Sequence, residues 1–132
     1  MPAALKSSPN LVLVADDDPL LVMLIEHHLI SAGYKVISAS DGEAALSLIR
    51  LESPAAVILD QMMPIMSGSE VLRHLKAEQG LSDLKVLMLT TLKSEDQVVS
   101  ALKLGAADFL TKPFSPAELV ARIDKLVPLA AA

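Results

Sequence analysis

Six polar residues stand at or directly after short apolar runs, and their types suit metal and phosphate chemistry. They are Asp16, Asp17, Asp18, Asp60, Thr90 and Lys112. Carboxylate oxygens are the ligands that hard cations prefer, while an ammonium and a hydroxyl can donate hydrogen bonds to phosphoryl oxygens. If the chain brings these residues together, they could form a site for phosphoryl chemistry.

The three consecutive aspartates repel one another, a cost that becomes tolerable when a hard cation lies between them. Mg²⁺ keeps several waters and takes one or two carboxylates together with phosphate oxygens. We therefore expect a Mg²⁺ site with a phosphoryl group as the natural co-ligand. Asp60, which ends a separate apolar run, then becomes the candidate nucleophile.

The elements that must position these residues alternate along the chain. Five apolar runs are separated by segments of helical length and period, which is typical of crossover units and of a parallel sheet covered on both faces. The expected strands are Leu11–Ala15, Lys35–Ala39, Ala55–Leu59, Leu84–Thr90 and the weaker Asp108–Thr111. The predicted fold is α/β with five strands and five helices. Because ligands bind outside the carboxyl ends of such strands, residues far apart in sequence should converge there.

Helix boundaries are marked by capping residues. Four serines are each followed three residues later by Glu or Gln, the capping-box arrangement. These pairs are Ser40 with Glu43, Ser67 with Glu70, Ser94 with Gln97, and Ser115 with Glu118. The first helix is expected to begin with the cap Asp18 and Pro19, and Gly33, Gly80 and Gly105 are expected to end helices in left-handed conformations.

Four tracts together resemble one known family. They are Leu11-Val-Leu-Val-Ala-Asp-Asp-Asp18, Val57-Ile-Leu-Asp-Gln-Met-Met-Pro-Ile-Met-Ser-Gly68, Val86-Leu-Met-Leu-Thr-Thr91 and Gly105-Ala-Ala-Asp-Phe-Leu-Thr-Lys-Pro-Phe114. The chain resembles the receiver domains of two-component response regulators, including chemotaxis-type receivers, from about Leu11 to Val127. This resemblance implies a flavodoxin-like, doubly wound sheet of strand order 2-1-3-4-5. It also implies a phosphoacceptor signalling domain rather than an enzyme.

The resemblance further implies a role for each matching residue. Asp60 would be the phosphorylated aspartate, and Lys112, followed by an often cis Pro113, would pair with the phosphoryl group. Thr90 would be the switch hydroxyl and Phe109 the switch aromatic. The magnesium ligands implied are Asp17 directly, Asp16 through water, Asp60 and the backbone carbonyl of Met62.

Two departures from the family pattern concern dephosphorylation. Thr91 stands where a very small residue is usual, which would crowd access to the phosphoryl group. Met62 and Leu92 occupy positions whose side chains tune dephosphorylation in relatives, and both are apolar, so neither can hold an attacking water by hydrogen bonding. We therefore expect a comparatively long-lived phosphoryl state.

Composition restricts the remaining possibilities. The chain has 132 residues, enough for one domain, and no cysteine, which excludes disulfides and thiolate chemistry. Its net charge of -5 with scattered basic residues argues against direct nucleic-acid binding, and no apolar run is long enough for a membrane span. We expect a cytoplasmic protein with a loose leader at 1–10, a receiver domain at 11–127 and a tail at 128–132.

Two other functions compete with the receiver interpretation. A phosphatase of the haloacid-dehalogenase type would use Asp16-x-Asp18 as its nucleophile motif, but it needs a further acidic pair after a later strand, and no acid follows Thr90 until Glu95. That reading also leaves Asp60 without a role. A pseudo-receiver, a binding module that is not phosphorylated, requires a missing site residue, and none is missing.

The expected partners follow from the resemblance. A sensor histidine kinase or a histidine phosphotransfer protein would dock on apolar residues near the site, namely Leu20, Leu21, Met23, Leu24, Pro113 and Phe114. A second copy of the chain is another candidate, because Asp108, Glu118 and Arg122 match charges that related receivers use to dimerise. The set is incomplete, since Val98 and Asp124 replace two expected basic residues. Readout is expected on the surface of the fourth helix, the fifth strand and the fifth helix.

Overall fold

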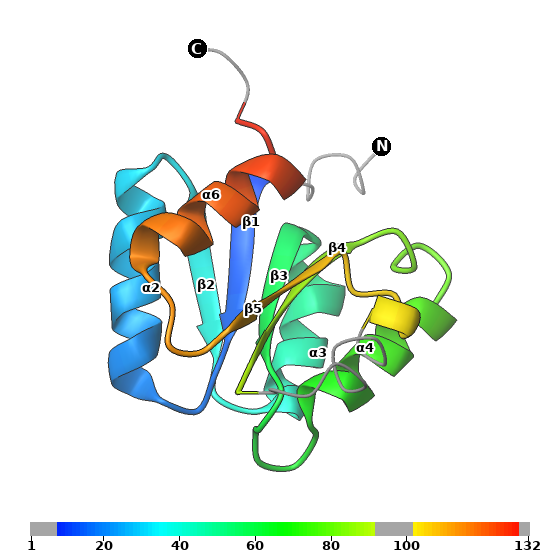
Figure 1. Ribbon diagram of the computed structural model, residues 1–132. Helices are drawn as coiled ribbons and strands as arrows, with labels where there is room; N and C mark the ends of the chain where they lie inside the picture. Colours follow the sequence, from blue (N-terminus) through cyan, green and yellow to red (C-terminus); the bar gives the residue numbers. More distant parts are fainter. Residues whose placement is uncertain (1–7, 92–101, 130–132) are drawn as a thin grey trace.

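A five-stranded parallel sheet forms the centre of the molecule (Figure 1), with strand order β2-β1-β3-β4-β5. The computed structural model describes residues 8–91 and 102–129. The strands are β1 Ser8–Ala15, β2 Lys35–Ala39, β3 Pro54–Asp60, β4 Lys85–Thr90 and β5 Asp108–Thr111. The predicted α/β class and strand order are confirmed.

Helices cover both faces of the sheet. In Figure 1, α2 (Pro19–Ser31) and α6 (Pro116–Leu126) lie on one face, and α3 (Gly42–Glu52) and α4 (Gly68–Ala77) lie on the other. Each face has its own cluster of buried apolar side chains, one with members such as Ile25, Ile58 and Ile123, the other including Ile49. Because both faces are covered, the central strands are apolar along nearly their whole length.

The fourth of the five predicted helices falls largely on residues 92–101, with its capping pair Ser94 and Gln97. These residues lie outside the described ranges. The fifth predicted helix is α6. Within the described residues, no helix is both long and apolar enough to cross a bilayer.

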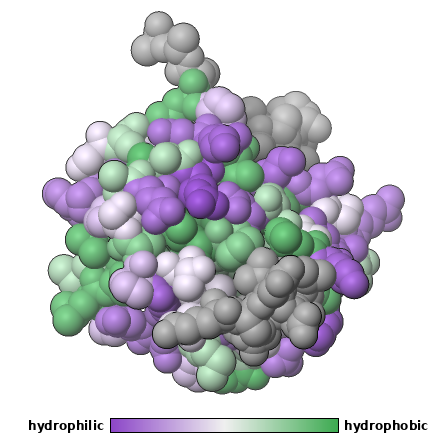
Figure 2. All heavy atoms as spheres, viewed as in Figure 1, coloured by the Kyte–Doolittle hydropathy of each residue, from purple (hydrophilic) through white to green (hydrophobic). Residues whose placement is uncertain are grey.

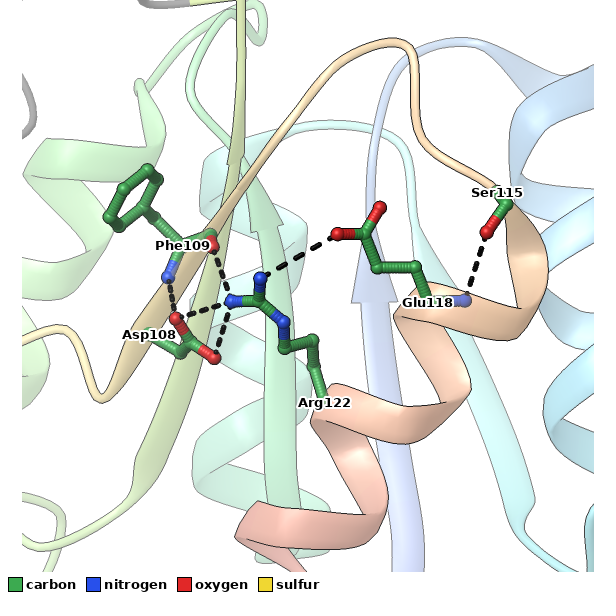
Figure 3. Close-up of polar contacts among 5 residues, drawn as sticks. All are labelled: Asp108, Phe109, Ser115, Glu118 and Arg122. Atoms are coloured by element: carbon green, nitrogen blue, oxygen red, sulfur yellow. Dashed lines mark hydrogen bonds and ion pairs between the residues drawn. The ribbon is translucent and has the colours of Figure 1, made fainter.

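The predicted helix starts are partly confirmed. Asp18 caps α2 by accepting from the amides of Leu20 and Leu21, and Ser67 and Glu70 form a complete capping box on α4. Ser115 accepts from the amide of Glu118, as predicted, while the carboxylate of Glu118 faces Arg122 instead. Figure 3 shows both contacts.

The capping box predicted at Ser40 is wrong. The N-cap of α3 is Asp41, whose carboxylate accepts from the amide of Ala44 at 2.8 Å. A carboxylate is as good a cap as a hydroxyl, so the serine three residues before Glu43 does not settle the helix start when an aspartate follows it.

The predicted helix ends differ in detail. Gly33 has φ +106°, and the amides of Gly33 and Tyr34 bond back to Ile30 and Leu29, as in a Schellman motif. Gly80 and Gly105 also have positive φ, but α4 already ends at Ala77, so Gly80 lies in the following turn.

Strand boundaries shift by one to three residues from the predicted ones. β1 begins at Ser8, so it takes in the last three residues of the stretch predicted to be a leader. β3 gains Pro54 and Asp60, and β4 begins at Lys85. The predicted bounds of β2 and β5 are confirmed. The division of the chain at residues 11 and 127 stays a prediction.

Candidate functional site

Three carboxylates converge at the carboxyl ends of β1 and β3. Oxygen atoms of Asp16, Asp17 and Asp60 all lie within 4.8 Å of one another. β1 and β3 are hydrogen-bonded neighbours, so the residues that end them meet at the same edge, the lower one in Figure 1. The predicted acidic cluster is therefore assembled by the parallel pairing of two central strands.

The three aspartates of this cluster differ in how far they are exposed to solvent. Asp16 is 1% exposed and Asp60 is 5% exposed, whereas Asp17 is open to solvent. Asp17 also borders two surface hollows, of about 570 and 330 Å³, on either side of it. A ligand arriving from solvent therefore meets Asp17 first, and the two buried carboxylates lie behind it.

Lys112 joins the two buried carboxylates. Its Nζ lies 3.0 Å from Oδ2 of Asp16 and 3.0 Å from Oδ1 of Asp60. The lysine follows β5, which is separated from β1 by β3 and β4, and its side chain extends along the carboxyl ends of the strands to Asp60 and Asp16. Its amide donates to the carbonyl of Thr90 at 2.8 Å, and the Lys112–Pro113 peptide bond is cis, as the resemblance implied.

The position of Asp16 is fixed from two sides. Its Oδ1 accepts the amide of Asp18 at 3.0 Å, while its Oδ2 accepts from Lys112. Asp18 in turn is occupied as the cap of α2. A phosphatase that used Asp16-x-Asp18 as its nucleophile motif would need these carboxylates free for chemistry, so this geometry disfavours that alternative.

Burial is the main reason that the pKa of Asp60 is raised above its ordinary value, and the charges of Asp16 and Asp17 raise it further. The hydrogen bond from Lys112 opposes this rise but does not cancel it. For Lys112, burial lowers the pKa, yet the hydrogen bonds to Asp16 and Asp60 outweigh it and raise the pKa of the ammonium. The pocket therefore holds more negative charge than one lysine balances comfortably, which favours binding of a cation.

The donor set fits a hard divalent cation. All three side chains offer oxygen, and their oxygens are close enough to share one ion. The loop after β3 can add a backbone carbonyl, since Met62 and Met63 border the same hollow as Asp17. The Met62 side chain itself is 74% exposed, so only its backbone bears on the site.

Asp60→Asn is expected to raise the stability of the metal-free protein at pH 7, because the folded state penalises the ionised carboxylate. A raised pKa means that stability falls as pH rises from the ordinary value of 3.8 toward the folded-state pKa, and stays reduced above it. Removal of the charge should raise Tm by a few degrees, since about 1 kcal/mol corresponds to roughly 4 °C in a small domain.

Thermal unfolding in EDTA at pH 7 and at pH 3.5 measures this effect. The stabilisation should shrink at the lower pH, where the wild-type carboxyl is mostly protonated in both states. Asp83→Asn, at an exposed position before the amino end of β4, is the matched charge control and should leave Tm unchanged. An Asp60→Asn protein that is less stable than wild type at pH 7 would contradict the expected sign.

Thr90 and Phe109 lie on neighbouring strands at this edge. Thr90 ends β4 and is 3% exposed, and β3 beside it ends in Asp60. Phe109 is on β5, paired in register with Met88 of β4, and its half-buried ring packs against the core cluster beneath α3 and α4. Thr90 thus lies on the strand next to the one that ends in Asp60, and Phe109 lies on the strand next to that of Thr90.

Sequence reasoning missed the role of Gln61. Its Oε1 accepts from the amide and the hydroxyl of Ser69, at 2.9 and 2.7 Å. The side chain that directly follows Asp60 therefore ties the loop after β3 to the first turn of α4. No local pattern signals this contact, because glutamine is equally common as a solvated loop residue.

Arg122 lies in a cluster that the sequence suggested for dimerisation (Figure 3). Its Nη1 donates to both carboxylate oxygens of Asp108, at 2.9 and 3.0 Å, and to the carbonyl of Phe109 at 3.3 Å. Its Nη2 lies 3.6 Å from Glu118. Asp108 also accepts the amide of Phe109 at 2.8 Å. All three charges are thus satisfied within one chain, around the backbone of Phe109.

Comparison with known proteins agrees with this geometry. The family model described as "Response regulator receiver domain" matches residues 12–124. The chain is 46% identical over 116 residues to the probable transcriptional regulator ycf27 of Porphyridium aerugineum, covering 88% of the chain and 47% of that protein. It is 41% identical to the alkaline phosphatase synthesis transcriptional regulatory protein PhoP of Bacillus subtilis, covering 88% of the chain and 48% of that protein.

Solved structures give the same assignment. The receiver domain of the Francisella response regulator 1452 superposes with a TM-score of 0.85 at 36% identity, covering 89% of this chain and 96% of that one. The chain spans about half the length of the curated relatives it matches. With the family model covering most of its residues and an acidic pocket consistent with phosphoacceptance, the chain belongs to the receiver domains of two-component response regulators.

Proposed function

We propose that Asp60 accepts a phosphoryl group from a phosphohistidine of a sensor histidine kinase or a histidine phosphotransfer protein. A carboxylate oxygen of Asp60 attacks phosphorus, a P–O bond forms as the P–N bond breaks, and the electron pair of that bond stays on the donor's imidazole. The observation that carries this proposal is the placement of Lys112, with Nζ 3.0 Å from both buried carboxylates.

Lys112 and Thr90 would receive the transferred group. Lys112 can exchange a carboxylate oxygen of Asp60 for a phosphoryl oxygen without losing Asp16 as a partner. Thr90, at the end of the neighbouring strand, supplies a hydroxyl donor. Phosphoryl transfer depends mainly on such positioning and on neutralisation of charge.

Mg²⁺ is the proposed metal, held by Asp17 and Asp60, by Asp16 through water and by the Met62 carbonyl. When bound, it would neutralise the clustered acids and the phosphoryl oxygens. Every side chain in this ligand set offers oxygen, which is the donor atom that a hard cation such as Mg²⁺ prefers. Asp16 and Lys112 then keep Asp60 oriented with one oxygen toward the incoming phosphorus.

The direct test is to phosphorylate the chain with acetyl phosphate in the presence of Mg²⁺ and to map the modified residue by mass spectrometry. Reductive trapping with borohydride would convert an aspartyl phosphate to homoserine, which marks the site permanently. We expect the mark at Asp60. A mark at Asp16, Asp17 or Asp18 instead would contradict the proposed function.

The kinase or phosphotransfer partner is proposed to dock on the first turns of α2. Leu20 is 75% exposed, Met23 is 64% exposed and Leu24 is 43% exposed. Figure 2 shows hydrophobic residues gathered at the left edge of the molecule, over α2. Leu21 lines a hollow of about 320 Å³ together with Lys112, Pro113 and Phe114. This hollow connects the exposed apolar residues of α2 with Lys112 of the candidate site.

Serine substitutions at Leu20 and Met23 are expected to lower kcat/KM for transfer from the cognate kinase by tenfold or more, since truncation of a hot-spot anchor costs about 2 kcal/mol or more and each 1.4 kcal/mol is about tenfold. Labelling by acetyl phosphate, which needs no docking, should stay unchanged. Ile30→Ser is the matched control, because Ile30 is 57% exposed in the last turn of the same helix. Unchanged transfer to the Leu20 and Met23 variants would place docking elsewhere.

The proposed long-lived phosphoryl state rests on Thr91 and Met62. Thr91 is exposed and lines the hollow beside Lys112, so its side chain stands on the approach to the site. Met62 offers no donor or acceptor for a hydrolytic water. Leu92 lies outside the described residues.

A dimer through the β5 and α6 charges would require an exchange of partners. Asp108, Glu118 and Arg122 already pair within the chain. The named relatives are transcriptional regulators about twice as long as this chain, and we propose that the phosphoryl state is passed to an output function through this same surface.

A further inference from the structure

The loop between β3 and α4 holds an unusual backbone shape. Ile65 has φ +71°, and the amide of Met66 donates to the carbonyl of Pro64 at 2.7 Å, which forms a γ-turn centred on Ile65. A β-branched residue at positive φ is a genuine outlier and persists only where its surroundings enforce it. The Ile65 side chain is 72% exposed, so its own packing does not enforce the turn.

Two glycines at the borders of this loop allow its backbone to pack closely against its surroundings. A Cβ on Gly68 would lie 2.4 Å from the carbonyl oxygen of Asp60, so Gly68 permits the close closure of the loop at its base. A Cβ on Gly42 would lie 2.1 Å from the carbonyl oxygen of Met66 and 2.7 Å from its Cβ. The loop therefore rests with its backbone directly on the first residue of α3.

Gly42 can support the loop because its own position is fixed at the start of α3. It is buried, it is the first residue of α3, and Asp41 beside it is fixed by its capping bond to Ala44. Gly42 belongs to α3, whereas the proposed metal ligands lie at the ends of β1 and β3 and in the loop after β3. A movement at this contact would be transmitted along the short loop to Met62.

We propose that Gly42 is a positioning residue for the metal site: it seats the backbone of Met66 and thereby fixes where the Met62 carbonyl points. This inference rests on the proposed function, which assigns that carbonyl to Mg²⁺. Mg²⁺ demands near-ideal octahedral geometry at short distances, while Ca²⁺ accepts longer and more variable coordination. A shifted carbonyl should therefore cost Mg²⁺ binding more than Ca²⁺ binding.

The test is calorimetric titration of the whole chain with Mg²⁺ and with Ca²⁺, without phosphodonor. Gly42→Ala adds a methyl group that must push Met66 away, because the atoms it meets are the backbone carbonyl of Met66 and its Cβ, none of which is the far end of a flexible side chain. We expect the Kd for Mg²⁺ to rise at least tenfold and the Kd for Ca²⁺ to rise less than threefold. Ser47→Ala, at an exposed position of the same helix, should change neither value.

A folded Gly42→Ala protein with wild-type Mg²⁺ affinity, or with equal losses for both ions, would overturn the proposal, since a merely destabilised site would lose both ions alike. If Gly42→Ala does not fold, Ile65→Gly tests the same loop without touching Gly42. Glycine fits φ +71° without strain but leaves the loop freer, so we expect Mg²⁺ binding to weaken about threefold while the metal-free Tm does not fall. Unchanged Mg²⁺ binding in that variant would also overturn the proposal.

Failure of the proposed function gives a different result. If wild-type protein does not bind Mg²⁺, or if Asp17→Ala binds it as well as wild type, the metal assignment itself is wrong. If wild type binds and Asp17→Ala does not, the comparison of Gly42→Ala with Ser47→Ala judges the positioning role alone.

Discussion

Asp60→Asn is expected to abolish labelling by acetyl phosphate, and removal of Mg²⁺ with EDTA is expected to reduce wild-type labelling by at least a hundredfold. Asparagine keeps the shape of the side chain but has no anionic oxygen to attack phosphorus. The clustered acids repel an incoming phosphoryl group unless a cation neutralises them. Asp17→Ala should resemble metal removal, because Asp17 is the solvent-facing member of the cluster.

Phosphate-affinity electrophoresis or intact-mass measurement gives the labelled fraction. Asp83→Asn serves again as the matched control, since Asp83 is exposed and precedes the amino end of β4, at the opposite edge of the sheet. Stoichiometric labelling of Asp60→Asn would exclude Asp60 as the acceptor. Undiminished labelling in EDTA would exclude an essential metal.

Thr90→Ala is expected to confine the response to phosphorylation to the pocket. Beryllofluoride, a phosphoryl mimic, should shift wild-type amides from Thr90 through β5 to α6, because the hydroxyl moves toward the bound group and vacates space that the ring of Phe109 can fill. The mimic can bias the two packings only by the difference in contacts that it makes with each. Without the hydroxyl that difference is largely lost.

The path to α6 is specific enough to follow residue by residue. Arg122 of α6 donates to the carbonyl of Phe109, and Asp108 accepts its amide, so a change at Phe109 should appear at Arg122 (Figure 3). Amide chemical shifts with and without beryllofluoride measure this. Thr90→Ser retains the hydroxyl and should respond as wild type does. Equal spread in Thr90→Ala and wild type would show that the hydroxyl is not the relay.

Periodicity and spacing were enough to predict the framework of the molecule and the convergence of its acidic residues. Branched apolar runs separated by helical segments require parallel strands, and parallel strands bring their carboxyl ends to one edge. Asp16, Asp60 and Thr90 could therefore be placed at one site before any contact was known. Local caps such as Ser67 with Glu70 could also be predicted from the sequence, because both partners lie within one helical turn.

Tertiary packing decided which of these groups meet. Sequence spacing places Lys112 at the edge but cannot show that its Nζ lies between Asp16 and Asp60, since that depends on how three strands sit side by side. Arg122 looked available to a second chain, yet it is engaged by Asp108 within its own.

The sequence drew attention to Ser40 as the cap of the second helix and gave no prediction for Gly42, whereas the cap is Asp41. The close contact of Gly42 with the backbone of Met66 depends on how α3 packs against the loop after β3, so only the tertiary structure shows it. Contacts of this kind join segments distant in the chain, and their energies depend on distances of a few ångströms that no local pattern encodes.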